Sequence, residues 1–124
     1  MIKKEIIIGL ITGFIANISG ASVDEYVSVV KKFDNSNISA LEINISCPNV
    51  KEGGVHFGND YEMTSRIVSE CRKNTKKPLI IKLSPNQSNI AMSAQKCIDA
   101  GADGLSVINT ISAMSIDIKS RKPV

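Results

Sequence analysis

Cys47 is the side chain with the clearest chemical potential, because it follows an apolar run and opens a glycine-rich loop. Pro48 cannot donate to a strand ladder, and it restricts the residue before it to extended geometry. The apolar run at 40–45 should therefore end with the thiol at its C-terminal edge. A thiol in such a loop can act as a general base or a nucleophile, and the alternative is a buried structural cysteine. His56, the only histidine, is expected to be a solvated loop residue, so a Cys-His pair is not predicted.

Lys82 is the second candidate, because it is embedded in the apolar run at 78–83. A buried ammonium is unfavourable unless an anion accompanies it, so we expect this side chain to reach the rim of a sheet. There it could face negative charge that develops on a ligand. The alternative is a lysine that extends into solvent at a strand end.

Several amide and hydroxyl side chains stand at comparable positions. Each could form a turn or a cap by itself. Gathered at one rim, they would provide the donors and acceptors that suit a heterocycle with amide and carboxylate groups. These residues are Asn17, Asn44, Asn49, Asn109 and Thr110.

The elements that would position these residues are four apolar runs, at 12–18, 40–45, 78–83 and 104–108. The runs are continuous and rich in β-branched residues, as expected of parallel strands buried on both faces. Helical spacing of apolar residues separates them, at 23–33, 63–71 and 90–98. Cys71 and Cys97 fall on the apolar faces of two of these helices, so we expect them in the core. The expected caps are Ser22 with Glu25, Asp60, and Gly101.

This order predicts an α/β fold with right-handed parallel crossovers. A doubly wound open sheet and part of a (β/α)8 barrel are both compatible with it. Polar residues end all four runs, which favours the barrel, because its strand ends converge on one mouth. A complete barrel takes roughly 250 residues. With 124 residues, the chain is predicted to form a partial TIM barrel of about four consecutive parallel βα units, a single domain over residues 1–124 and a fragment of a longer protein.

Composition excludes several classes of function. Fifteen basic and twelve acidic residues are scattered along the chain, so a nucleic-acid surface is not predicted. Acidic residues are not clustered for a metal, and three widely spaced cysteines indicate a reducing, cytoplasmic compartment. The N-terminal apolar run after Lys3 and Lys4 has the look of a signal peptide, but Glu5 weakens that interpretation. The run is too short to span a membrane.

Three segments together resemble class 1 dihydroorotate dehydrogenases. They are residues 44–58 (NISCPNVKEGGVHFG), 81–86 (IKLSPN) and 100–110 (AGADGLSVINT), with residues 11–20 resembling the family's preceding strand. The Lys-Glu-Gly-Gly loop with Phe57 and Gly58 is most similar to the class 1B, NAD-linked subgroup.

The resemblance implies an FMN-binding TIM barrel that oxidises dihydroorotate to orotate in pyrimidine biosynthesis. Cys47 would be the base that removes the C5 proton while hydride leaves C6 for FMN, a role that suits a thiol whose pKa can be lowered by its environment. Lys82 would lie against the pyrimidine end of the flavin and stabilise the anionic reduced ring. Asn44, Asn49, Asn109 and Thr110 would bind substrate, and Asn17, Asn44, Lys82 and Ile108 would bind the cofactor.

The resemblance also implies what the 124 residues lack. The family's early Lys and Ser and its Asn-rich substrate loop would precede Met1, and the segments that bind the FMN phosphate would follow Val124. We therefore expect the isolated chain to be inactive. The family further implies a homodimer and a partner subunit that carries FAD and an iron–sulfur cluster. Two alternatives stay open: another pyrimidine-acting flavin barrel similar to dihydropyrimidine dehydrogenase, and a non-catalytic half-barrel that self-associates through its sheet edges.

Overall fold

The computed structural model describes residues 13–46, 60–111 and 113–124. Strands and helices alternate along the chain, as the sequence predicts. The elements are β1 (Ile15–Ile18), α1 (Val23–Asp34), β2 (Ala40–Asn44), α3 (Tyr61–Lys73), β3 (Leu79–Lys82), α4 (Ile90–Asp99) and β4 (Gly104–Ser106).

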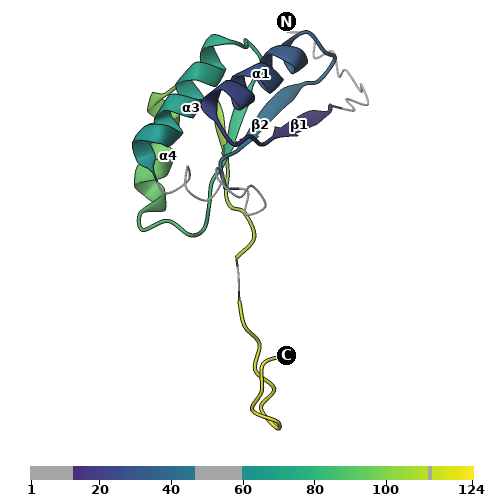
Figure 1. Cartoon of the computed structure of the whole chain (residues 1–124), viewed down its shortest axis with the longest axis vertical. Coiled ribbons are helices and arrows are strands. Elements are labelled where there is room, and N and C mark those ends of the chain that lie inside the picture. The colour runs from purple at the N-terminus through teal and green to yellow at the C-terminus, as the bar shows by residue number, and fades with distance from the viewer. Residues whose placement is uncertain (1–12, 47–59, 112) are drawn as a thin grey trace, which may run out of the picture.

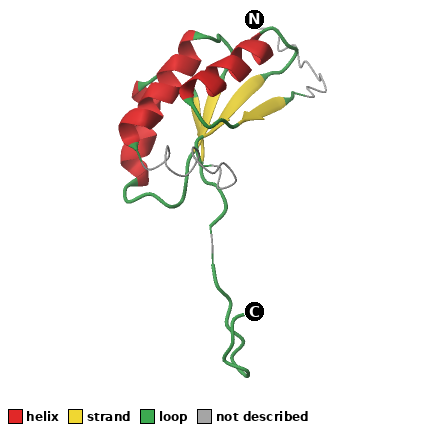
Figure 2. Ribbon diagram, in the orientation of Figure 1, coloured by secondary structure: helices red, strands yellow, loops and turns green. Residues whose placement is uncertain are grey.

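The four strands form one parallel sheet in the order β1-β2-β3-β4. The helices α1, α3 and α4 of the described residues lie on one side of this sheet (Figures 1 and 2). Right-handed crossovers between strands in sequential order place every helix on the same face, whereas a doubly wound sheet carries helices on both faces. The arrangement is that of consecutive βα units of a TIM barrel, which confirms the predicted fold class. In the described part of the chain the sheet is open, and its edges are β1 and β4.

The hydrophobic core lies between the sheet and the helices. It contains the side chains that alternate residues of each strand direct toward the helices, together with apolar residues of the helices themselves. From the strands come Ile18, Leu41, Ile43, Leu79 and Ile81, all at most 2% exposed. The expectation of strands buried on both faces is met by β2, where only Glu42 is not buried, but not by β1 or β3. β3, for example, alternates buried and partly exposed residues along its length.

The strands are also shorter than their apolar runs, and the first residue of the first run lies outside the described residues. β4 ends at Ser106, two residues before the predicted boundary, and β2 and β3 each end one residue early, at Asn44 and Lys82. β2 and β3 thus end on Asn44 and Lys82, two of the polar residues singled out in the sequence, whereas Asn109 lies three residues beyond the end of β4. In β1 the polar residue Asn17 is followed by Ile18, which completes the strand.

The helix caps follow the sequence. Glu25 donates its backbone N–H to Ser22 Oγ (3.2 Å), and Asp60 accepts from the first turn of α3. Gly101 has a positive φ of 103° after α4. The backbone N–H groups of Gly101 and Ala102 donate to the carbonyls of Ile98 and Cys97, which is the Schellman arrangement for ending a helix.

The C-terminal residues 113–124 extend away from the helices and sheet as an arm (Figure 1). Near its end Ile116 and Pro123 form an antiparallel bridge, and Asp117 Oδ1 accepts the backbone N–H groups of Lys119 and Ser120. Among the described residues no helix is long and apolar enough to cross a bilayer.

Candidate active site

The face of the sheet opposite the helices carries the polar side chains. The strand register pairs Asn17 of β1 with Glu42 of β2. Two residues further along β2, Asn44 pairs with Lys82 of β3, and Lys82 pairs in turn with Ser106 of β4. Residues in register or two apart along a strand share a face. Since the neighbouring residues of these strands point into the core, all five polar residues belong to the open face. This face would be the interior of a barrel.

Asn17 and Glu42 form a direct contact across the first two strands. The Nδ2 of Asn17 donates to Oε2 of Glu42 over 2.7 Å. Asn17 is exposed and Glu42 is partly buried. The contact engages only the nitrogen of the Asn17 amide among the described residues, so its carbonyl oxygen stays available to a ligand.

Asn44, Ser46 and Asn109 form a cluster at the C-terminal end of the sheet. Asn44 Oδ1 accepts from the backbone N–H (3.2 Å) and the hydroxyl (3.1 Å) of Ser46. Asn109 Nδ2 donates to Ser46 O (3.0 Å) and to Ser46 Oγ (2.8 Å). The buried hydroxyl of Tyr26 in α1 donates to the Asn44 carbonyl (2.9 Å), which fixes the backbone below the cluster. Asn44 Nδ2 has no hydrogen-bond partner among the described residues.

Lys82 lies beside Asn44 on the neighbouring strand. It is partly exposed, and no described carboxylate lies within ion-pair distance of its ammonium. The sequence prediction that Lys82 reaches the rim therefore agrees with its place at the end of β3. An ammonium without a protein counterion is suited to a ligand that carries or develops negative charge.

The remaining candidates have different surroundings. The backbone N–H of Thr110, which is exposed, donates to Asn109 Oδ1 (2.8 Å), and Ile108 is partly buried against the core. Cys47 and Asn49 lie outside the described residues. Asn17, Asn44 and Lys82 share the open face, and Asn109 joins them through Ser46.

Cys71 and Cys97 are buried core residues, as their helical positions predict. Burial raises the pKa of each thiol to about 12, since an apolar environment disfavours the thiolate. At neutral pH both groups are protonated and unreactive. Neither competes with Cys47 as a base.

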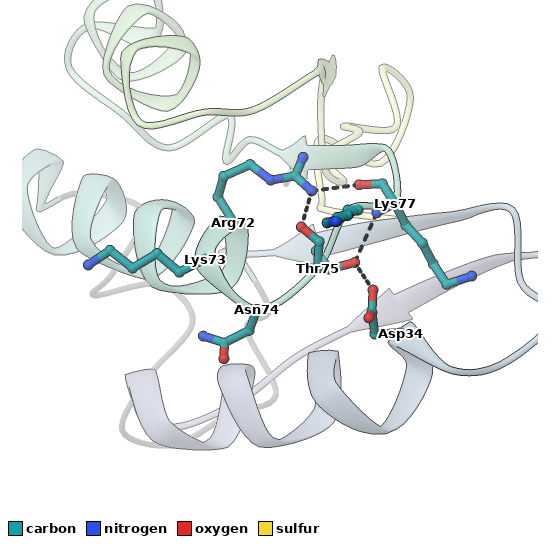
Figure 3. Close-up of a pocket in the computed structure, with 7 residues that line it drawn as sticks. Asp34, Arg72, Lys73, Asn74, Thr75 and Lys77 are labelled. Carbon is teal, nitrogen blue, oxygen red and sulfur yellow. Dashed lines mark hydrogen bonds between the residues drawn. The ribbon is translucent and has the colours of Figure 1, made fainter.

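The opposite end of the sheet, where the strands begin, holds a second polar cluster (Figure 3). Arg72 Nη1 contacts Asp103 Oδ2 (2.7 Å), and Arg72 Nη2 donates to the carbonyls of Thr75 and Lys77. Thr75 Oγ1 donates to Asp34 Oδ1 (2.5 Å). These contacts join the segments that precede β3 and β4 to the end of α1. The hollow lined by these side chains is therefore a structural junction at the wrong end of the sheet for a barrel active site.

Sequence reasoning missed Glu42 and Ser46. Glu42 falls within the run at 40–45 that is predicted as a continuous apolar strand, although a single acidic residue in such a run is the signal that one face is polar. Ser46 stood beside the more conspicuous Cys47. Its role depends on Asn109, 63 residues later, and no local pattern could reveal that contact.

Comparison with known proteins gives a consistent result. The family profile described as dihydroorotate dehydrogenase matches residues 3–124. The chain is 50% identical over 113 residues to the dihydroorotate dehydrogenase B (NAD(+)) catalytic subunit of Petrotoga mobilis, and 51% identical over 114 residues to that of Pelobacter propionicus. The subunit of Oceanobacillus iheyensis is 49% identical over 114 residues. Each alignment covers 91% of this chain, and the chain spans 38% of the length of each relative.

Proposed function

The chain belongs to the dihydroorotate dehydrogenase family, and from this premise we propose that it forms half of an FMN-dependent active site that oxidises dihydroorotate to orotate. The observation that carries the proposal is the shared open face of the sheet, where Asn17, Asn44 and Lys82 lie at or near the C-terminal strand ends. In barrels of this kind the active site is built at that end.

The residues present fit the polar edge of a flavin. That edge offers carbonyl oxygens and an N–H group, so it requires both donors and acceptors from the protein. Lys82 and Asn44 Nδ2 are donors without a described partner, and Asn17 Oδ1 is an acceptor without one. FMN, when bound, would supply the acceptor for the hydride that leaves C6 of the substrate.

The chain's own residues would divide the remaining work. Lys82 would place a positive charge beside the flavin, and Asn17, Asn44 and Ile108 would line the same cofactor. Asn44 would also contact the substrate, together with Asn49, Asn109 and Thr110. The Asn109 side chain is already fixed by Ser46, which lowers the entropy lost when substrate binds.

Cys47 would act as the general base. Its sulfur would take the C5 proton of dihydroorotate and later release it to solvent. A thiol suits this role because its reference pKa, about 8.5, is close enough to neutral pH for its surroundings to tune.

The proposal extends to the whole protein. The three relatives are named catalytic subunits, and we propose that this protein likewise works with a second subunit, one carrying FAD and an iron–sulfur cluster that passes electrons to NAD. A homodimer of the catalytic subunit and a cytoplasmic location belong to the same proposal.

The test uses a full-length chimera, in which this chain's residues replace the matched 113 residues of the Petrotoga mobilis subunit. The purified chimera should bind FMN, and anaerobic dihydroorotate should bleach the flavin absorbance near 450 nm, roughly the usual position of the oxidised flavin band. Dihydrouracil, a substrate of the dihydropyrimidine dehydrogenase type, should leave it unchanged. Bleaching by dihydrouracil alone would favour that alternative enzyme and reject ours.

A Cys47→Ala chimera should keep its flavin while the rate of bleaching by dihydroorotate falls roughly a hundredfold to ten-thousandfold, the usual contribution of a general base. Cys71→Ala, which removes a core thiol, is the matched control and should leave the rate per bound flavin unchanged. Full activity in Cys47→Ala would show that another group removes the proton.

A further inference from the structure

Glu42 is a charged residue that the proposed roles leave unused. It lies in the middle of β2, partly buried, on the open face that carries Asn17 and Lys82. A carboxylate within a strand is unfavourable unless it accepts hydrogen bonds or faces a cation. Its one described side-chain contact is with Asn17, over 2.7 Å.

This contact determines which way the Asn17 amide faces. An asparagine side chain has a donor end and an acceptor end of nearly equal size, so an unconstrained amide can present either. An ionised carboxylate only accepts, and Glu42 therefore binds the nitrogen end. The carbonyl oxygen of Asn17 is thereby directed away from Glu42, where a ligand on the open face can donate to it.

We propose that Glu42 is a positioning residue for the flavin site, which acts by fixing the Asn17 amide with its oxygen toward the cofactor. The inference rests on the proposed function, because it assumes that Asn17 contacts the flavin. A neutral acceptor in place of Glu42 would preserve the orientation, and loss of the side chain would let the amide rotate. Charge-assisted hydrogen bonds are stronger than neutral ones, so the carboxylate holds the amide more firmly than an uncharged acceptor would.

The test measures the FMN dissociation constant of the full-length chimera by quenching of flavin fluorescence. Glu42→Ala should raise this constant about tenfold, the loss expected when one well-placed hydrogen bond to the ligand is no longer pre-formed. Glu42→Gln should give a constant between those of the parent and of Glu42→Ala, because the glutamine amide can accept from the Asn17 nitrogen but can also donate to its oxygen. Glu70→Ala removes a carboxylate that pairs with Lys73 on the surface of α3 and should leave the constant unchanged.

A double-mutant cycle separates positioning from a general effect on the fold. Once Asn17→Ala has removed the amide, adding Glu42→Ala should change the dissociation constant no further. Independent, additive losses would overturn the inference, as would a Glu42→Ala chimera that binds FMN as tightly as the parent. The melting temperature of the flavin-free chimera should not follow the ranking of the affinities.

If Glu42→Ala fails to fold, Asn17→Asp tests the same contact. Two carboxylates would then face each other, and FMN binding should weaken. Adding Glu42→Gln should recover most of the loss, since glutamine can donate to the new aspartate, and absence of recovery would overturn the inference. A parent chimera that binds no FMN would instead reject the proposed function, whereas failure of the variants alone rejects only the role of Glu42.

Discussion

The two ends of the sheet treat their polar groups differently. Where the strands begin, Arg72 contacts Asp103 and two backbone carbonyls, and Lys77 Nζ donates to the carbonyls of Ser36 (2.9 Å) and Ile38 (3.0 Å). Where the strands end, Lys82 and the Asn44 amide nitrogen have no partner among the described residues.

This difference indicates that the polar groups where the strands begin stabilise the fold, whereas those where the strands end are available to a ligand. Buried and partly buried polar groups in native proteins are normally hydrogen-bonded, and those that are not call for a specific explanation. The satisfied cluster holds loops together at the end of a barrel that is concerned with stability. Lys82 and Asn44 Nδ2 lie at the C-terminal end of the strands, the end where barrels of this kind bind their ligands. Variants at the two ends should therefore change different measured quantities.

Arg72→Leu should produce the largest change in stability. The substitution removes the contacts of a partly buried guanidinium with the Asp103 carboxylate and with two backbone carbonyls. We expect the free energy of unfolding of the chimera, measured by urea denaturation, to fall by about 3 kcal/mol. FMN affinity of the folded protein should stay within about twofold. Arg66→Leu, at an exposed position of the same helix, is the control and should cost less than about 0.5 kcal/mol. A large loss of FMN affinity in Arg72→Leu would contradict the assignment of stability to the start of the strands and of ligand binding to their C-terminal end.

Lys82→Met should give the converse result. The change keeps the length of the side chain and removes the charge, so FMN binding should weaken about thirtyfold, equivalent to about 2 kcal/mol. Stability without flavin should be unchanged or slightly higher, because no protein contact is lost. The matched control is Lys76→Met, an exposed lysine near the start of the same strand. Equal effects of the two substitutions on FMN affinity would contradict a site at the C-terminal end.

Gly101→Ala should lower the free energy of unfolding by about 1 to 2 kcal/mol, the cost of a left-handed conformation for a residue with a side chain. A Cβ at this position would also lie 2.8 Å from Arg72 Cγ, so the substitution would disturb the cluster at the strand starts. Gly104→Ala is the control, since the nearest side-chain atom would be 3.8 Å away. Gly104→Ala should be neutral or slightly stabilising. An equal loss of unfolding free energy in both variants would show that the left-handed conformation of Gly101 is not the cause.

The smallest effect should appear at low pH. The hydrogen bond from Thr75 lowers the pKa of Asp34 below its ordinary value of 3.8. A carboxyl whose folded pKa is lowered contributes stability above its unfolded pKa and loses that contribution as the pH falls through the folded one. The free energy of unfolding should thus decrease below about pH 4. Both Asp34→Asn and Thr75→Val should make this decrease shallower, and unchanged slopes in both would show that the contact has no role.

Local sequence signals predicted the elements because their causes are local. The cap at Ser22, the cap at Asp60 and the left-handed Gly101 each depend on neighbours within a few residues, and all three are confirmed. The polar residues at the ends of the apolar runs also indicated that Asn44 and Lys82 lie at the C-terminal end of the sheet.

The features that sequence reasoning missed depend on distant residues. The partner of Glu42 is 25 residues away, and the partner of Arg72 in its ion pair is 31 residues away. Continuous β-branched runs concealed the polar face, because Glu42 and Ile80 occupy equivalent positions in register and only one of them is charged. Which residues share a face became clear only from the pairing of the strands.

A crystal structure of the chimera with FMN bound would test the central claim most directly. We predict that the isoalloxazine ring lies against the open face, with Lys82 and Asn44 Nδ2 donating to the ring and the Asn17 carbonyl accepting from it. A flavin bound elsewhere, or Lys82 paired with a protein carboxylate in its presence, would contradict the account.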